Sequence, residues 1–311
     1  MTERTNSAAN GLLLSGLDGS NPLGFLSALG LLGTLDASAR MKWVPAAGTW
    51  VPSLSCSKGD TPSEKSLLDT LQERLVNDLA NHPAHVLEIL RSDSDRARRC
   101  LFADEREKAC VAERTIVDWL SALASDFSSP DAINQLQTAR RDYFLGNLAD
   151  VIQRTTIDHL RRSIFSTWDY ADPLEKQSLH LDPSEDRRHA HQWNQPSGDP
   201  NRKKFGGMLG ANRLAIEAIC FFVSVPKGDV LQTTGFSGSR SSDTRWTWPI
   251  WDVACSLQVV RSLLTLPALQ MEQLDESTRT ALREWGIAAV FRTNRILVNK
   301  TPNFTPARRV A

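Results

Sequence analysis

Histidines and carboxylates gather in one short stretch of the chain, where they could bind a metal ion. His180, Asp182, Asp186, His189 and His191 lie within 12 residues, and imidazole and carboxylate groups are the usual ligands of zinc and manganese in hydrolytic enzymes. The alternative is that the acidic run caps a short helix and the imidazoles face solvent or phosphate. The alternative is favoured because no H-E-x-x-H motif accompanies the cluster. A metal-dependent hydrolase or nuclease is therefore kept as a second hypothesis.

Basic side chains in the last third of the chain favour nucleic-acid binding. Guanidinium groups bind phosphates in a fork, and aromatic rings such as Trp193 and Phe304 can stack on unpaired bases. Asn212 opens an apolar helix after a glycine-rich loop, and Arg240 lies at the tip of a polar hairpin loop. The predicted nucleic-acid-binding residues are Arg187, Arg188, Arg202, Lys203, Lys204, Asn212, Arg213, Arg240, Arg245, Arg292 and Arg295. We predict no catalytic residue, metal or cofactor, and favour a binding protein over an enzyme.

The charge distribution points the same way. The chain has 311 residues with 36 basic and 36 acidic side chains. From Arg187 to the end there are 17 basic and 9 acidic residues, an excess of eight positive charges that the preceding part offsets. A basic section suits a polyanion, because neutralised phosphates release counterions. The alternative interpretation of this charge distribution is that the two oppositely charged sections of the chain attract each other.

Other kinds of chemistry find less support. No G-x-S-x-G nucleophile motif is present, and Cys220 and Cys255 lie in apolar surroundings typical of structural thiols. Two turns with glycine, at 17–22 and 206–213, could cradle a phosphate at a helix start or simply be tight turns. The five cysteines form no C-x-x-C pair, and the apolar stretch 12–35 is interrupted by polar residues, so we expect a cytoplasmic protein with reduced thiols.

The elements that must position these residues follow from the apolar spacing. A short strand at 12–14 precedes a buried helix at 22–36, with Asn21 or Ser20 as its cap, and then a hairpin at 41–51. Helical spacing predominates between Ser63 and Trp168, including one long helix at 142–165. The C-terminal part is predicted to contain helices at 212–222, 253–266 and 276–284, a hairpin pairing 230–234 with 244–248, and a hairpin around Thr293 and Asn294.

These elements predict an α+β fold, with a mostly antiparallel sheet from the N-terminal strand and the C-terminal hairpins and a helical insertion in the middle. The sequence divides into residues 1–60 (strand, buried helix and hairpin), 61–168 (helical domain or insertion) and 169–311 (a loop-rich basic section that completes the sheet). Trp246, Trp248 and Trp251 alternate with other residues, and we expect two of the three rings to lie in the core.

Several short motifs together resemble a known family. They are 17–26 (LDGSNPLGFL), 167–173 (TWDYADP), 182–188 (DPSEDRR), 210–215 (GANRLA), 234–236 (TGF), 248–251 (WPIW) and 303–307 (NFTPA). The chain resembles CRISPR-associated proteins of the type I-G (formerly I-U) class, and among them the large-subunit component of the effector complex. The resemblance covers most of the chain outside the helical middle.

The resemblance implies a non-catalytic subunit of an RNA-guided surveillance complex in antiviral defence. Such a subunit contacts the guide RNA and the double-stranded target DNA near the protospacer-adjacent motif, beside other effector-complex subunits, and leaves cutting to a recruited helicase-nuclease. A third possibility is an assembly protein whose apolar helix and tryptophan-rich strand bury against a partner.

Overall fold

Helices and antiparallel strands make up the computed structural model, which confirms the α+β class. It describes residues 11–46, 48–57, 60–77, 87, 103–104, 107, 114–123, 134–174, 176–184, 206–227, 230–238, 243–298 and 301–311. The helices are α1 (Pro22–Thr34), α2 (Glu64–Leu71), the π-helical turn Gln72–Asn77, α5 (Arg114–Leu123), α6 (Arg141–Arg154), α7 (Ile157–Phe165), α8 (Leu209–Ala218), the 3₁₀ turn Ile219–Phe221, α9 (Leu257–Leu264), the 3₁₀ turn Pro267–Gln270 and α10 (Glu276–Glu284). The strands are β1 (Leu12–Leu13), β2 (Ala39–Ala46), β3 (Thr49–Cys56), β4 (Ser224–Lys227), β5 (Val230–Thr233), β6 (Phe236–Ser237), β7 (Arg245–Trp251), β8 (Ile287–Val298), β9 (Thr301–Phe304) and β10 (Arg308–Arg309).

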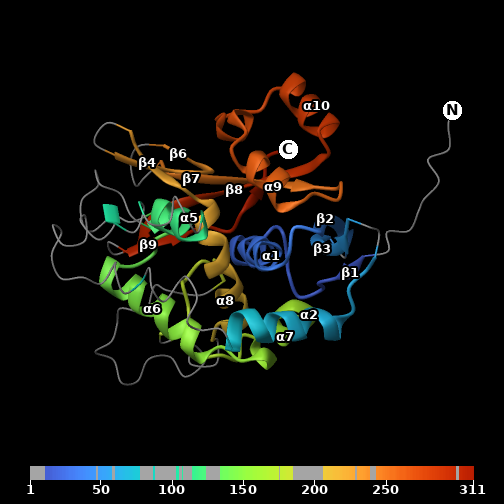
Figure 1. Cartoon of the computed structure of the whole chain (residues 1–311). Helices are drawn as coiled ribbons and strands as arrows, with labels where there is room; N and C mark the ends of the chain where they lie inside the picture. The colour runs from blue at the N-terminus through green and yellow to red at the C-terminus, as the bar shows by residue number, and fades with distance from the viewer. Residues whose placement is uncertain are drawn as a thin grey trace.

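Helix α1 occupies the centre of the molecule (Figure 1). Its first residue is Pro22, and the Asn21 side chain accepts hydrogen bonds from the main-chain N–H groups of Leu23 and Gly24 at 2.8 and 3.3 Å. This confirms the predicted cap. Its residues from Pro22 to Leu32 are all buried. The uniformly apolar sequence thus produces a core helix, not an amphipathic surface helix.

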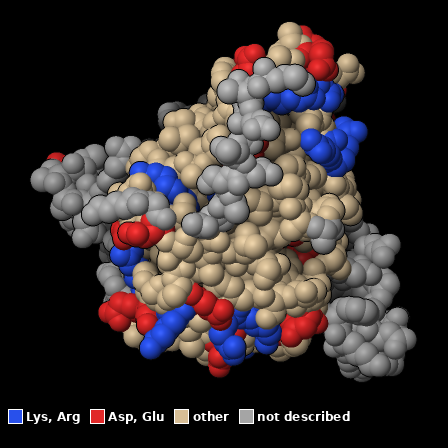
Figure 2. Space-filling model, turned by 90° about the vertical axis from the view of Figure 1, so that its right-hand side faces the viewer, with Lys and Arg blue, Asp and Glu red and all other residues tan. Residues whose placement is uncertain are grey.

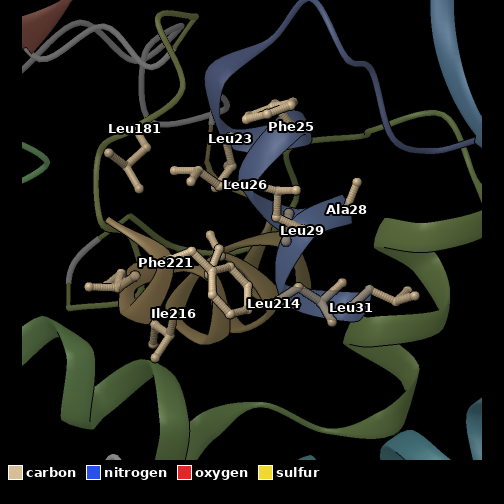
Figure 3. Close-up of a cluster of buried hydrophobic side chains, with 14 of the residues drawn as sticks. Leu23, Phe25, Leu26, Ala28, Leu29, Leu31, Leu181, Leu214, Ile216 and Phe221 are labelled. Atoms are coloured by element: carbon tan, nitrogen blue, oxygen red, sulfur yellow. The ribbon is translucent and has the colours of Figure 1, made fainter. Parts of the chain in front are cut away.

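Helices α1 and α8 pack closely against each other (Figure 3). A Cβ atom on Gly30 would lie 1.8 Å from the main-chain oxygen of Leu214, so only glycine permits this approach. The Ser27 hydroxyl donates to the Ala211 main-chain oxygen at 2.8 Å. Leucines of both helices and the Phe221 ring fill the surrounding space. The small residues in α1 therefore serve helix packing.

In the part of the chain that the structure describes, the strands form three sheets, whereas the sequence predicted one. Strands β1–β3–β2, β4–β5 and β10–β8–β7–β6 are separate, and β9 pairs with the far end of β8. The hairpin of β2 and β3 is confirmed. An antiparallel bridge between Met41 and Cys255 links β2 to the loop after β7. One hydrophobic core nevertheless includes residues from all three predicted sections of the chain.

Three local predictions are wrong in detail. Strand β5 pairs with β4 instead of β7, and the predicted hairpin at Thr293 and Asn294 is one continuous strand, β8, which pairs with β7 up to Asn294 and with β9 from Arg295. The helix expected at 142–165 breaks into α6 and α7 at Thr155 and Thr156. The break occurs because the Thr156 N–H donates to the His159 ring at 3.1 Å, a local cap that starts a new helix.

An aromatic cluster joins α1 to β7. Trp246, Trp248 and Trp251 are all fully buried, one more than the sequence predicted. The Trp246 and Trp248 ring centroids are 4.7 Å apart, and Phe25 of α1 contacts all three rings. The Trp248 ring N–H donates to the Gly19 main-chain oxygen at 2.9 Å, and that of Trp251 donates to Met41 at 2.8 Å. These tryptophans hold the core and are not available to stack on bases.

Candidate nucleic-acid interface

The C-terminal sheet brings together two of the predicted arginines, Arg245 of β7 and Arg292 of β8, with Arg308 of β10. Arg308 is the direct cross-strand partner of Arg292, and Arg292 lies opposite Thr247 of β7. Directly opposed like charges destabilise a sheet unless something of opposite sign lies between them. The positive charges of Arg245 and Arg308 both act on Arg292.

Arg292 is the most unusual of these residues because its guanidinium is buried without a carboxylate. Only 2% of the residue is exposed. Its Nε donates to the Thr247 hydroxyl at 2.9 Å, Nη1 to the Glu272 main-chain oxygen at 2.8 Å, and Nη2 to the main-chain oxygens of Met271 and Leu269 at 2.6 and 3.3 Å. Burial, and then the neighbouring arginines, lower the pKa of Arg292. All four acceptors are neutral oxygens, and the Glu272 carboxylate, which acts in the opposite direction on this pKa, makes no hydrogen bond to the guanidinium among those given above.

A pocket of about 550 Å³ opens above Arg292. Arg279 of α10 and Arg308 and Arg309 of β10 also line it, and Glu272 is its one acidic lining residue. We call this site the arginine pocket, defined by Arg279, Arg292, Arg308, Arg309 and Glu272. The side chains of the lining carry four positive charges and one negative charge, and the main chain of Ala311, which accepts from Arg309, also lines the pocket. Such a site attracts anions.

Most of the pocket's side chains are held in place by the fold. Arg279 Nε donates to the Leu274 main-chain oxygen at 3.0 Å, and Arg309 donates to the main-chain oxygens of Ala311 and Ala288 at 2.8 and 2.9 Å. The Glu272 carboxylate is 79% exposed and pairs with Arg245 Nη1 at 3.2 Å. Arg308 is exposed. Positioned guanidinium groups lose little conformational freedom when they bind an anion.

Three other predicted residues lie inside the fold. Asn212 is fully buried, and its side chain accepts from the Leu179 N–H at 2.8 Å and donates to the Met208 main-chain oxygen at 2.9 Å. Arg213 is buried and pairs with Glu217, one turn along α8, at 2.5 Å. Arg295 donates to the Gln137 main-chain oxygen at 2.8 Å, and burial lowers its pKa to about 10. These side chains stabilise the fold and do not belong to the arginine pocket.

The remaining predicted residues, Arg187, Arg188, Arg202, Lys203, Lys204 and Arg240, lie outside the described residues. Described residues on both sides of the 185–205 segment form hydrogen bonds with Tyr170. The Tyr170 main-chain oxygen accepts from the Gly206 N–H at 2.8 Å, and its hydroxyl donates to Asp182 at 3.0 Å. Asp182 in turn accepts from the Ser184 N–H at 2.9 Å and from the Asn21 side chain at 3.0 Å. This network joins the start of α1 to both sides of the segment.

The start of α8 is occupied by a carboxylate of the protein itself. Asp172 is buried and accepts from the Leu209 N–H at 2.7 Å and from the Arg162 guanidinium. It also lies 3.7 Å from the His159 ring. A Cβ on Gly206 would lie 1.9 Å from the Asp172 main-chain oxygen. The glycine-rich loop is therefore a tight turn whose helix end already binds an anionic group, not an open phosphate cradle.

The metal hypothesis gains no support. Among the residues that the structure describes, no group of three or more histidine, cysteine or acidic side chains is arranged to hold a metal ion. Asp182 makes the hydrogen bonds given above, and His180 is the other described member of the predicted cluster. Asp186, His189 and His191 lie outside the described residues.

Charged side chains are scarce across the face that carries the N-terminal sheet. Figure 2 shows this face, with charges gathered near α10 at the upper end and near α2 and α7 at the lower end, and few in the band between them. Within the described parts of the chain, no helix combines the length and apolar character needed to cross a membrane. The arginine pocket, with four arginines in its lining, is the candidate site for a polyanion.

A scan against protein-family models finds no family that matches the chain, and a search of the curated proteins also finds no match. The motifs and the geometry of the site therefore carry the functional proposal.

Arg279, Arg308 and Arg309 are not among the nucleic-acid-binding residues predicted from the sequence. Arg279 lies in an amphipathic helix, α10, where an arginine is typical of a solvent-facing position. The adjacent pair at 308–309 was a usable signal, because two consecutive arginines concentrate positive charge at one place in the chain. Their pairing with β8 is a tertiary contact that the sequence does not reveal.

The buried thiols give a test of the core around β7 and α8. Burial, and then Glu217 and Asp118, raise the pKa of Cys220, and burial and Asp252 raise that of Cys255. Since the thiolate is the reactive form, we expect iodoacetamide to modify half-buried Cys56 more than about tenfold faster than Cys220 in the native protein. Peptide mass spectrometry measures each rate. Equal native rates would contradict the burial of Cys220, and unfolding in denaturant should abolish the difference.

Proposed function

We propose that this chain is a non-catalytic nucleic-acid-binding subunit. The observation that carries the proposal is the arginine pocket, which Arg279, Arg308 and Arg309 line together with the buried Arg292 and in which Glu272 is the one acidic side chain. Arginine binds phosphate oxygens through two parallel hydrogen bonds, and a surface with excess positive charge gains from the release of counterions. The basic residues Arg187, Arg188, Arg202, Lys203 and Lys204 would add to the contact.

The finer proposal concerns the complex in which the subunit works. From the resemblance of its motifs, we place it in a type I CRISPR surveillance complex, where it would contact guide RNA and target DNA near the protospacer-adjacent motif. In support, motif segments far apart in the sequence contact one another: Asn21 contacts Asp182, and Trp248 contacts Gly19. These contacts bring three of the motifs together in the fold.

Replacing Arg308 and Arg309 together with glutamine tests the nucleic-acid role. We expect the double variant to bind single-stranded RNA and double-stranded DNA more weakly, with a salt dependence whose slope is smaller by about 2, because two phosphate contacts are lost. Fluorescence anisotropy across about 50 to 200 mM salt measures both quantities. Circular dichroism shows whether the variant remains folded.

The matched control replaces Arg140 and Arg154 with glutamine. Both are exposed arginines of the α6 region, and each pairs with a nearby aspartate. The control removes the same charge, so its slope should equal that of the wild type. No binding by the wild type at low salt, or the same loss in the control, would overturn the proposal. For the finer proposal, co-expression with the proteins encoded by neighbouring genes and a guide RNA should yield one co-eluting complex.

A further inference from the structure

We infer that the arginine pocket is a binding subsite for a single phosphate group and its attached sugar. The inference deepens the proposed function, on which it rests for the source of the phosphate. It assigns the pocket a specific ligand, whereas a diffuse basic surface would only attract a strand.

The charge argument begins with Arg292. A guanidinium has five N–H donors, and the four hydrogen bonds of Arg292 use four of them, all with neutral oxygens. One N–H on Nη1 therefore remains without an acceptor among these bonds, and Arg292 lines the pocket. The Glu272 carboxylate acts on this buried charge without a hydrogen bond to it. An anion in the pocket would supply a direct opposite charge and the missing acceptor.

The geometry favours phosphate over a smaller anion. Arg308 faces Arg292 across the β10–β8 pair, so both side chains lie on the same face of the sheet. Arg279 approaches from α10, and the four arginines of the lining suit a group with two negative charges. The volume of about 550 Å³ exceeds that of a bare phosphate, so an attached sugar also has room in the pocket. A phosphate that carries a nucleoside fits this combination.

Glu272 acts as a competitor inside the site. Its main-chain oxygen binds Arg292, while its exposed carboxylate pairs with Arg245, which is not one of the lining residues. A bound phosphate would be repelled by this carboxylate. Removing the charge of Glu272 should therefore strengthen phosphate binding without disturbing the core, since the side chain is 79% exposed.

Calorimetric titration with inorganic phosphate, at constant ionic strength set with chloride, tests the site. We expect saturable binding by the wild type, tighter binding by Glu272→Gln, and at least about tenfold weaker binding when Arg279 and Arg308 are both replaced with glutamine, because charge-assisted hydrogen bonds are lost. The variant that replaces Arg140 and Arg154 should behave like the wild type. Absence of saturable binding, or equal affinity in the Arg279 and Arg308 double variant, would overturn the inference.

Displacement by oligonucleotides identifies the source of the phosphate. If the subsite takes a terminal phosphate, a 5′-phosphorylated oligonucleotide displaces inorganic phosphate and the 5′-hydroxyl form does not. If it takes a phosphate within the strand, both displace it. Either result supports the subsite. Phosphate binding that neither oligonucleotide displaces would overturn the nucleic-acid source, and hence the proposed function at this pocket, while the phosphate site itself would stand.

Discussion

Replacing Gly30 with alanine is expected to lower the free energy of unfolding by about 3 kcal/mol, the upper end of what overpacking usually costs. The added Cβ would lie 1.8 Å from the Leu214 main-chain oxygen and 2.8 Å from its carbonyl carbon. Backbone atoms cannot move aside as the end of a flexible side chain can. Helices α1 and α8 must therefore separate, which disturbs their shared leucine contacts.

Gly146 provides the matched control for this substitution. It lies inside helix α6, where an added Cβ would meet no heavy atom within 4 Å. Alanine there should leave stability unchanged or raise it by up to about 1 kcal/mol, because alanine favours the helix over glycine. Urea unfolding followed by circular dichroism measures both variants. A Gly30→Ala protein as stable as the wild type would show that α1 and α8 do not approach as closely as described.

Asp172→Asn is expected to lower the free energy of unfolding by about 3 kcal/mol, the range typical of a broken buried ion pair. The carboxylate accepts hydrogen bonds from the Leu209 N–H and from Arg162 through different oxygens. Asparagine keeps the shape but replaces one oxygen with an NH₂ donor, so one of these two donors loses its acceptor. The guanidinium of Arg162 also loses its principal opposite charge.

Asp169→Asn is the control, because Asp169 pairs with the same arginine at 3.5 Å but is 48% exposed. Exposed ion pairs contribute little, so we expect a change below about 0.5 kcal/mol. Thermal unfolding followed by circular dichroism measures both variants. Equal effects of the two substitutions would show that burial at Asp172 contributes nothing special. Asp172 also pairs through its main chain with Gly207, which follows the 185–205 segment.

The structure bears differently on the two functional hypotheses that the sequence suggested. The metal hypothesis depends on a cluster of which only His180 and Asp182 are described, and Asp182 is engaged with Asn21, Tyr170 and Ser184. The nucleic-acid proposal gains a defined site that the sequence did not single out. Phosphate titration and the salt dependence of binding distinguish that site from a generally basic surface.

Much of the fold could be predicted from the sequence because it depends on local patterns. The apolar run after Asn21 and Pro22 specifies a buried capped helix, and the spacing of apolar residues specifies α2, α5 and α10. The hairpin of β2 and β3 follows from its turn residues. The α+β class follows from the order of these elements.

Strand pairing and side-chain burial, by contrast, required the tertiary structure. The apolar pattern of β5 or β8 is the same whichever strand lies beside it, so the sequence could not show that β5 pairs with β4 or that β8 continues through Thr293. The sequence likewise does not show whether an arginine is buried or exposed. Packing buries Arg213 beside Glu217 and places the buried Arg292 in the lining of the pocket. The sequence determined that the last third is basic. The fold decided which arginines meet, because only long-range pairing of β10 with β8 and the packing of α10 bring Arg279, Arg292 and Arg308 around one pocket.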